Sequence, residues 1–405
     1  MQDSGLANEE PWRSAQSIAE HLLDAGHETY FVGGCVRDRL LGLPVHDVDI
    51  ATAASPEQAE AVFKHAGLRT IAVGKAFGVI NVLSQTGEQV EVASFRSDGA
   101  YIDGRRPTTV TSSDARTDVH RRDFTINALL MDPRDGHLID HVGGQEDLRA
   151  KRLRTVGEPA DRLAEDRLRV LRALRFAAHL DLTIEPATWT ALCQTTLHGL
   201  SAERLMQEWN KALGGRDPGR WLILLGSSGR LAEFCPPLWG LDLDLTAERL
   251  RRCPSNIAVR CAVFLAAAPL ANVRTWLAAQ PLASERIKKI LWLLECEPER
   301  LAKGPASQRW RALRRGWPQD LASFTACCVP DHPRLSELAD WAADPRSART
   351  WKPLLTAGDL LNLGFTPGPA LGQALSLLED QELDGIITDR AEALRQAARL
   401  CPRLG

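Results

Sequence analysis

The stretch that decides the fold is residues 32–52, Val-Gly-Gly-Cys-Val-Arg-Asp-Arg-Leu-Leu-Gly-Leu-Pro-Val-His-Asp-Val-Asp-Ile-Ala-Thr. An apolar run leads into a Gly-Gly pair at 33–34, and an amphipathic segment follows and stops at Gly42. Asp47 and Asp49 then alternate with aliphatic residues, and in a strand this two-residue period places both carboxylates on one face. The stretch therefore predicts a strand, a glycine turn, a short helix and a second strand that carries paired acids.

Paired carboxylates on one strand face repel each other unless a cation lies between them. Mg²⁺ is the expected ion, because it combines one or two carboxylates with the phosphate oxygens of a substrate. Gly33 and Gly34 ahead of a helical turn would expose backbone N–H groups to an anion, and Arg37 would add a charge-assisted donor. A lone Asp-x-Asp or Gly-Gly usually marks only a solvated turn, so the order of the elements carries the prediction.

The composition is that of an ordinary globular chain of 405 residues, with 44% hydrophobic and 25% charged residues. The formal net charge of −3 excludes a broadly basic nucleic-acid binder, so any RNA contact must come from local patches. Nine cysteines without a Cys-x-x-Cys pair argue against a disulfide framework and a thiolate zinc site. The polar N-terminus is unlike a signal peptide, and no apolar run is long enough to span a bilayer. We therefore expect a cytoplasmic protein without membrane contact.

The first third of the chain alternates between helical and strand patterns, which predicts a small mixed α/β unit. Strands are expected at 69–73, 78–84 and 88–95. Glu91 lies in the last of these runs; it could complete a three-acid metal site, or it could simply face solvent. Residues 96–110 have the composition of a mobile loop, with Arg96, Arg105 and Arg106 among them.

A second charged cluster occupies residues 121–131, Arg-Arg-Asp-Phe-Thr-Ile-Asn-Ala-Leu-Leu-Met, which we expect to open a helix. Arg121 and Arg122 suit triphosphate oxygens, because the planar guanidinium matches phosphate geometry. Asp123 and Asn127 are four residues apart and would share a helix face, where they could read ribose hydroxyls. A basic helix start with an Asp N-cap is the alternative explanation.

The sequence from 161 to 180 has strong helix formers, no proline and no glycine, and it predicts one continuous helix. On such a helix Asp166 and Arg169 would be neighbours. The aspartate would accept from the exocyclic amine of C or A, and the arginine would donate to a ring nitrogen or carbonyl oxygen. G and U offer a different pattern, so the pair could select the two amino bases. A surface ion pair, worth at most ~0.5 kcal/mol, is the alternative.

These motifs, in this order, resemble the polymerase-β-like nucleotidyltransferases, in the branch of the class II tRNA nucleotidyltransferases (CCA-adding enzymes) and bacterial poly(A) polymerases. The resemblance covers residues 28–210 strongly and 350–395 more weakly. It implies an α/β head of polymerase-β-like type at 1–145, followed by an all-α neck at 146–215, body at 216–345 and tail at 346–405.

The resemblance implies transfer of CMP and AMP from CTP and ATP to the 3′ end of tRNA, without a nucleic-acid template. Asp47 and Asp49 would be the catalytic residues and hold two Mg²⁺ ions, with Glu91 as a possible third ligand. The implied nucleotide-binding residues are Gly33, Gly34, Arg37, Arg121, Arg122, Asp123, Asn127, Asp166, Arg169, Arg172 and Arg175. Residues 201–208, including Arg204, resemble a motif that buttresses the helix bearing Asp166, which implies a structural role.

Some alternatives stay open from the sequence. The shared motifs also fit an A-adding enzyme or a poly(A) polymerase, and the 96–110 loop leans against a CC-adding enzyme. A non-catalytic RNA-binding relative is a further alternative, against which the intact acid pair counts. The sequence does not predict the oligomeric state.

A basic run marks the otherwise helical second half, where residues 300–317 contain six basic side chains, two tryptophans and no acid. Such a run is either a solvated helix face or a patch that follows the phosphates of the tRNA, whose binding would weaken with salt. The candidate RNA-binding residues are Arg309, Arg311, Arg314 and Arg315.

Overall fold

The computed structural model describes residues 10–71, 78–99 and 109–401. The chain divides into two compact units: residues 1–216 with 220–234, and residues 217–219 with 235–405. The predicted boundaries at 145, 215 and 345 are finer than this division and stay predictions.

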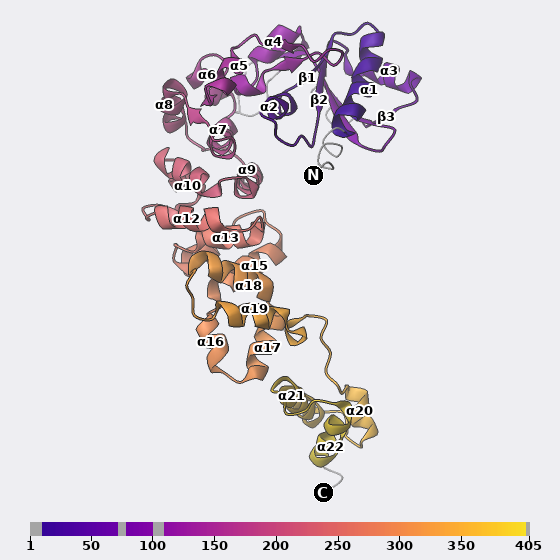
Figure 1. Ribbon diagram of the computed structural model, residues 1–405, viewed down its shortest axis with the longest axis vertical. Helices are drawn as coiled ribbons and strands as arrows, with labels where there is room; N and C mark the ends of the chain where they lie inside the picture. Colours follow the sequence, from indigo (N-terminus) through magenta and orange to yellow (C-terminus); the bar gives the residue numbers. More distant parts are fainter. Residues whose placement is uncertain (1–9, 72–77, 100–108, 402–405) are drawn as a thin grey trace. The chain divides into compact units, whose positions relative to one another are not determined.

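The first unit contains a mixed sheet of seven strands, counted over the described residues, of which β1, β2 and β3 are labelled in Figure 1. Its strand order is β3-β4-β5-β2-β1-β8-β9. The strands are β1 (Thr29–Val32), β2 (Asp49–Thr52), β3 (Arg69–Ile71), β4 (Val79–Leu83), β5 (Gln89–Ser94), β8 (Leu130–Met131) and β9 (Leu138–Ile139). The predicted α/β head is thus confirmed.

Strand β2 lies between β1, to which it is antiparallel, and β5, to which it is parallel. Ile50 pairs with Val92 of β5, so the acids one residue earlier, Asp49 and Glu91, are neighbours across the two strands. The strand itself begins only at Asp49. The predicted alternation nevertheless holds, because Val48 and Ile50 are buried whereas Asp47 is exposed and Asp49 is half-buried.

Three helices flank this sheet: α1 (Glu10–Asp24), α2 (Gly34–Leu40) and α3 (Pro56–His65). Helix α3 starts at a capping box, in which Ser55 accepts from the Gln58 N–H while the Gln58 side chain accepts from the Ser55 N–H. In Figure 1, α1 and α3 lie side by side next to the sheet.

The predicted loop at 96–110 begins and ends in paired strands, β6 (Arg96–Asp98) and β7 (Val110–Ser112). The prediction of loop structure at those ends was therefore wrong, and cross-strand pairing is the reason. Arg105 and Arg106 lie outside the described residues.

The predicted helix at 121–131 is also wrong. Helix α4 (Ala115–His120), capped by Asp114, ends at Arg121, where the predicted helix was to begin. A short 3₁₀ turn, η2 (Thr125–Asn127), then leads into β8. The apolar residues of this segment are taken up by the core of the sheet, which overrides their helical spacing.

The continuous helix predicted at 161–180 is instead two helices, α6 (Pro159–Glu165) and α7 (Leu168–His179). Asp166 between them is extended, with φ −147° and ψ 102°. Its carboxylate accepts from the Leu168 N–H at 3.0 Å, a local bond that competes with helix formation. Asp166 and Arg169 therefore do not share a helix face.

Short elements complete the first unit. They are α5 (Gly144–Arg149), the parallel pair β10 (Arg152–Leu153) and β11 (Thr183–Ile184), α8 (Pro186–Gln194), α9 (Ala202–Gly214), α10 (Pro218–Ser227) and α11 (Leu231–Phe234). Helix α5 begins in a loop where Asp140 accepts from four successive N–H groups at 142–145. Burial alone would raise the pKa of Asp140, but these four donors outweigh it and lower that pKa.

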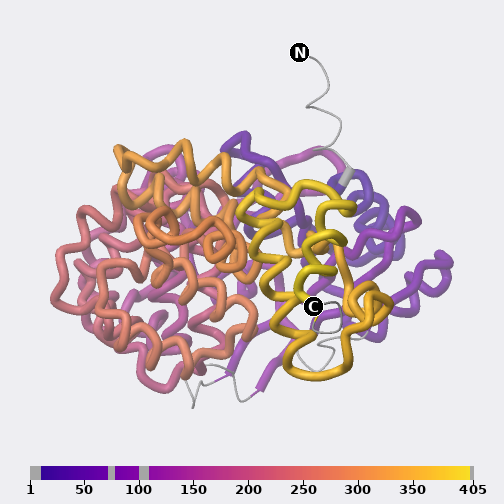
Figure 2. Tube along the Cα trace, turned by 90° about the horizontal axis from the view of Figure 1, so that it is seen from below, coloured from indigo at the N-terminus to yellow at the C-terminus, as the bar shows by residue number. Residues whose placement is uncertain are grey.

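The second unit is helical over its described residues, as predicted. Its elements are η3 (Pro236–Leu238), α12 (Asp244–Arg252), α13 (Ile257–Leu265), α14 (Leu270–Ala278), α15 (Ser284–Glu295), α16 (Pro298–Lys303), α17 (Ala306–Arg315), α18 (Pro318–Cys328), α19 (Leu335–Ala343), η4 (Pro345–Ser347), α20 (Ala357–Asn362), α21 (Pro369–Leu383) and α22 (Arg390–Leu400). The last three helices, at the yellow end of the trace in Figure 2, enclose a core that includes Leu360, Phe365 and Leu378. Within the described ranges, no helix combines the length and the apolarity needed to cross a bilayer.

Gly144 is a position where the fold leaves no room for a side chain. A Cβ there would lie 2.2 Å from the backbone oxygen of Thr125. We expect Gly144→Ala to lower the free energy of unfolding by about 1–3 kcal/mol, the usual cost of overpacking. Urea denaturation followed by circular dichroism measures this.

Gly214 is the matched control, since it is the last residue of α9 and a Cβ there meets open space. Gly214→Ala should leave stability unchanged or raise it by up to ~1 kcal/mol. Equal effects of the two substitutions would contradict the close packing of α5 on η2.

Candidate active site

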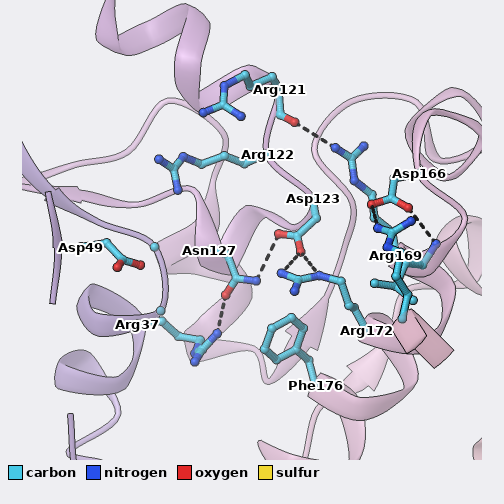
Figure 3. Close-up of a pocket in the computed structure, with 14 residues that line it drawn as sticks. Arg37, Asp49, Arg121, Arg122, Asp123, Asn127, Asp166, Arg169, Arg172 and Phe176 are labelled. Atoms are coloured by element: carbon cyan, nitrogen blue, oxygen red, sulfur yellow. Dashed lines mark hydrogen bonds and ion pairs between the residues drawn. The ribbon is translucent and has the colours of Figure 1, made fainter. Parts of the chain in front are cut away.

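One cavity of about 440 Å³ in the first unit gathers most of the predicted site residues (Figure 3). All of the predicted nucleotide-binding residues except Arg175 line it, and Asp49 lines it as well. The lining residues are Gly33, Gly34, Arg37, Asp49, Arg121, Arg122, Asp123, Asn127, Asp166, Leu168, Arg169, Arg172, Phe176 and Arg204. Segments from 33 to 204 thus converge on one place.

Asp49 is the acid of this cavity with the least compensated charge. Burial, together with the charges of Glu91 and Asp47, raises its pKa to about 6, against the opposing effect of Arg122. Three carboxylates therefore act on one another here, as the alternation and the β2–β5 pairing predict. Crowded carboxylates of this kind favour either a proton or a cation.

The donor set fits a hard divalent cation, because carboxylate oxygens are its preferred protein ligands. However, within the described part of the chain no three His, Cys, Asp or Glu side chains form a group able to hold a metal. Asp47 and Asp49 would therefore supply the protein ligands, and a nucleotide would supply further oxygens. Glu91 is exposed, and its effect on Asp49 is electrostatic.

Gly33 sets the backbone beside Asp49. Its φ of +83° and ψ of −133° are accessible to glycine, and a Cβ there would lie 3.4 Å from the Arg122 guanidinium and 4.0 Å from the Asp49 carboxylate. This residue lets the turn between β1 and α2 pass close to both charged groups.

Arg121 and Arg122 share one buried acid, Asp118, at 2.8 Å and 3.0 Å. Burial would raise the pKa of Asp118, but the two guanidinium groups outweigh it and lower that pKa. The acid thus holds both arginines at the cavity wall. Figure 3 shows them along one side of the cavity, with Arg122 nearer to Asp49.

A chain of hydrogen bonds crosses the cavity floor (Figure 3). Arg37 donates to the Asn127 oxygen, Asn127 donates to Asp123 at 3.2 Å, and Arg172 donates to Asp123 at 2.6 Å and 2.9 Å. Burial opposes ionisation of Asp123, but Arg172, Asn127 and Arg169 bring its pKa down to about 2. Asp123 and Asn127 are thus in contact without a shared helix face.

Phe176 is a cavity residue that the sequence reasoning missed. Arg37, Arg172 and Arg175 lie over its ring at 5.0, 5.4 and 4.3 Å from the centroid. Such cation–π contacts orient guanidinium groups without neutralising them. The signal in the sequence is the spacing, because Phe176 is four residues after Arg172 on a helix. Arg175 itself lies outside the cavity lining and pairs with Glu208 at 2.6 Å.

Asp166 and Arg169 both line the cavity and are held by separate partners. Arg169 donates to Glu165 at 2.5 Å and to the backbone oxygens of Arg162 and Arg121. Asp166 accepts from Arg204 at 2.7 Å. The resemblance implied only a structural role for Arg204. Arg204 is therefore a second cavity residue that the sequence reasoning missed.

The four candidate RNA-binding arginines lie in the second unit, and Arg309, Arg311 and Arg314 have partners there. Arg311 and Arg314 pair with Glu379 of α21, and Arg314 also stacks on Trp351. Arg309 stacks on Trp310 and Trp341. Arg315 is exposed and lines a second cavity, of about 440 Å³, together with Arg311, Arg314 and Arg349.

The raised pKa of Asp49 predicts a cost to folding. The pKa of Asp49 is about 6 in the folded protein and 3.8 in the unfolded chain. At neutral pH the ionised Asp49 therefore lowers the free energy of unfolding. We expect Asp49→Asn to stabilise the metal-free protein by about 2 kcal/mol at pH 8. Because wild-type Asp49 is protonated below pH 6 when folded, this gain should fade between pH 6 and pH 4. Urea unfolding in EDTA at several pH values measures it.

Asp24→Asn is the control for this prediction, since the Asp24 side chain is 79% exposed. It should leave stability unchanged at each pH. A pH-independent effect of Asp49→Asn would show that burial and the neighbouring carboxylates do not destabilise the ionised form of Asp49.

Comparisons with known proteins identify the family to which the chain belongs. Residues 29–154 match the family described as "Poly A polymerase head domain", and residues 181–240 match "Probable RNA and SrmB- binding site of polymerase A". A CCA-adding enzyme of Levilactobacillus brevis is 35% identical over 95% of this chain and 97% of that enzyme.

Solved structures show the same likeness. A Bacillus stearothermophilus CCA-adding enzyme in complex with CTP matches with a TM-score of 0.78 and 30% identity, over 96% of this chain and 98% of that one. A Thermotoga maritima CCA-adding enzyme complexed with tRNA shares the fold, with a TM-score of 0.68 and 21% identity over 95% and 94% of the two chains. Nucleotidyltransferases of this type generally depend on a metal ion. The chain belongs to the family of the CCA-adding enzymes, nucleotidyltransferases with a poly(A) polymerase head domain.

Proposed function

We propose that this protein adds or repairs the 3′-terminal CCA of tRNA, transferring CMP and AMP from CTP and ATP without a nucleic-acid template. The observation that carries the proposal is one cavity that is shared by Asp49, by the arginines of α2 and α7 and those that directly follow α4, and by Asp166 with Arg169. An acid for catalysis, cations for a triphosphate and a donor–acceptor pair for a base are the parts that the reaction requires. The full-length likeness to a CCA-adding enzyme supports this substrate choice.

In the proposed mechanism, Asp47 and Asp49 hold Mg²⁺. When bound, these ions would activate the terminal 3′-hydroxyl and neutralise charge on the leaving pyrophosphate. Arg37, Arg121 and Arg122, with the N–H groups at 33–34, would bind the triphosphate. Asp123 and Asn127 fix Arg37 and Arg172 in place before the nucleotide arrives, so little reorganisation is needed during reaction.

Base selection follows from what each side chain can donate or accept. An ionised Asp166 can only accept, which suits the exocyclic amine of C or A and leaves the keto oxygen of U or G facing another acceptor. Arg169 can only donate, and Glu165 aims it. We place Arg172 at the triphosphate and Arg175 behind it, where Arg175 supports Phe176.

We propose that tRNA also contacts the second unit at Arg309, Arg311, Arg314 and Arg315, with Arg315 the member least committed to protein partners. Since Arg311 and Arg314 already pair with Glu379, the net charge of this patch is lower than the sequence run suggests. We also propose that the reaction takes place in the cytoplasm.

The test uses tRNA transcripts that lack the 3′-terminal CCA, incubated with Mg²⁺ and each NTP or their mixture, and sequenced at the 3′ end. We expect C-C-A followed by a stop, and no addition of U or G. Asp47→Asn and Asp49→Asn should each reduce the rate by at least ~10³-fold, because charge stabilisation is the main catalytic term. A run of A residues, or activity retained in both variants, would contradict the proposal.

Replacing Asp166 tests base selection separately from chemistry. Asp166→Ala removes the acceptor for the exocyclic amine, so we expect CTP-over-UTP preference in kcat/KM to fall by 10-fold or more. Asp161→Ala, in helix α6 outside the cavity lining, is the control and should keep the preference. If UTP and GTP stay excluded in Asp166→Ala, Asp166 does not read the base.

A further inference from the structure

The second cavity lies within the second unit, and its volume of about 440 Å³ equals that of the cavity in the first unit. Its lining comes from α17, from α21 and from the segment 349–351. Helices α17 and α21 pack against each other, as Figure 1 shows. Sites for small ligands typically measure roughly 300–1,000 Å³, so the second cavity is large enough for one.

Four arginines and one acid line the second cavity. Glu379 of α21 pairs with Arg314 at 2.8 Å and with Arg311 at 3.4 Å, and Arg311 also pairs with Asp380 at 2.9 Å. Two acids of α21 therefore balance two arginines of α17. These ion pairs fix the wall of the cavity and leave the charge of the other two arginines uncompensated by α21.

Arg315 and Arg349 are the arginines available to a ligand. Arg315 is exposed and pairs with no acid among the described residues. The Arg349 side chain is 52% exposed, and it pairs at 3.4 Å with Glu285, which is 63% exposed. Exposed ion pairs of this kind contribute little and are exchanged easily for a better anion. The Arg349 guanidinium also lies 4.8 Å from the centroid of Trp317, which orients it without neutralising it.

Trp351 gives the second cavity an aromatic surface. Its indole is half-buried and lines the cavity, and the Arg314 guanidinium lies 4.3 Å from the ring centroid. Guanidinium groups alone would suit any small anion. An aromatic ring beside them is the combination that binds nucleotides, because the ring stacks on a base while the cations bind its phosphate.

We propose that the second cavity is a nucleotide site, which takes one nucleoside monophosphate unit with its base against Trp351 and its phosphate on Arg315 and Arg349. A free nucleotide and an unpaired nucleotide of an RNA present the same base and phosphate, so either can supply this unit. The inference goes beyond the proposed function and does not assume which nucleotides the first unit adds. With RNA as the source, it rests on the tRNA contact proposed above and adds a base-binding residue to it.

Photolabelling of the full-length protein with 8-azido-AMP in EDTA locates the site. We expect an adduct, mapped by mass spectrometry, on a peptide that contains Trp351. Unlabelled AMP should prevent this adduct. Adenosine lacks the phosphate and should need at least ~10-fold higher concentrations, because it gives up the charge-assisted bonds to the arginines.

Variants separate the two parts of the site. Arg315→Ala/Arg349→Ala and Trp351→Leu should each lower the labelling at least ~5-fold, through loss of the phosphate contacts or of the stacking surface. Trp351→Phe should keep most of the labelling, since a smaller ring still stacks. The controls lie outside the cavity lining: Arg274→Ala removes an ion-paired arginine that is 51% exposed, and Trp276→Leu removes a half-buried tryptophan. Both should label like the wild type.

Competition with tRNA that lacks its CCA end distinguishes the two sources. If RNA supplies the nucleotide, this tRNA should displace 8-azido-AMP from the peptide that contains Trp351. Trp351→Leu should then weaken tRNA binding at least ~5-fold without changing its salt dependence, whereas Arg315→Ala/Arg349→Ala should reduce that salt dependence. Labelling that persists at saturating tRNA assigns the site to a free nucleotide.

Labelling that is lost in the arginine double variant but kept in Trp351→Leu would show an anion site without a base, and would overturn the proposal. So would the absence of an adduct near Trp351 in the wild type combined with unchanged tRNA affinity in Trp351→Leu. A failure of CCA addition with the labelling intact would overturn only the proposed function.

Discussion

The first unit is organised by a charge constraint: six arginines line one cavity and would repel each other without compensation. Each is held by an acid or a carbonyl that lies beside the cavity. Asp118 forms ion pairs with Arg121 and Arg122, Asp123 pairs with Arg172, and Asp166 pairs with Arg204. Because the acids fix the arginines before any ligand is present, the site can bind a polyanion without large rearrangement. Among the acids of the cavity, Asp49 differs because its negative charge is not balanced by an arginine in this way, and this charge suits a cation.

The sequence was a reliable guide where the structure depends on local patterns. The alternation around Asp47 and Asp49 and the glycine turn before α2 are local patterns, and each formed as predicted. They depend on backbone geometry within a few residues, and the identities of those residues are enough to predict it. The likeness of ordered motifs then gave the head fold and nearly all of the cavity residues.

The sequence failed where a local pattern competes with a distant partner. The segment at 121–131 has helical spacing, but its last two residues, Leu130 and Met131, pair with β1 as strand β8. The helix at 161–180 breaks at Asp166, whose carboxylate bonds Leu168 and Arg204. The basic run around Arg311 and Arg314 looks unpaired until α21 supplies Glu379. None of these partners is near in sequence except Leu168, so spacing alone could not reveal them.

The placement of the cavity has a consequence for how the protein is made. Every residue that lines it lies between positions 33 and 204 of the 405-residue polypeptide. Domains generally fold as units while a ribosome is still translating the chain. A nascent polypeptide can therefore assemble this cavity while most of the second unit is still untranslated.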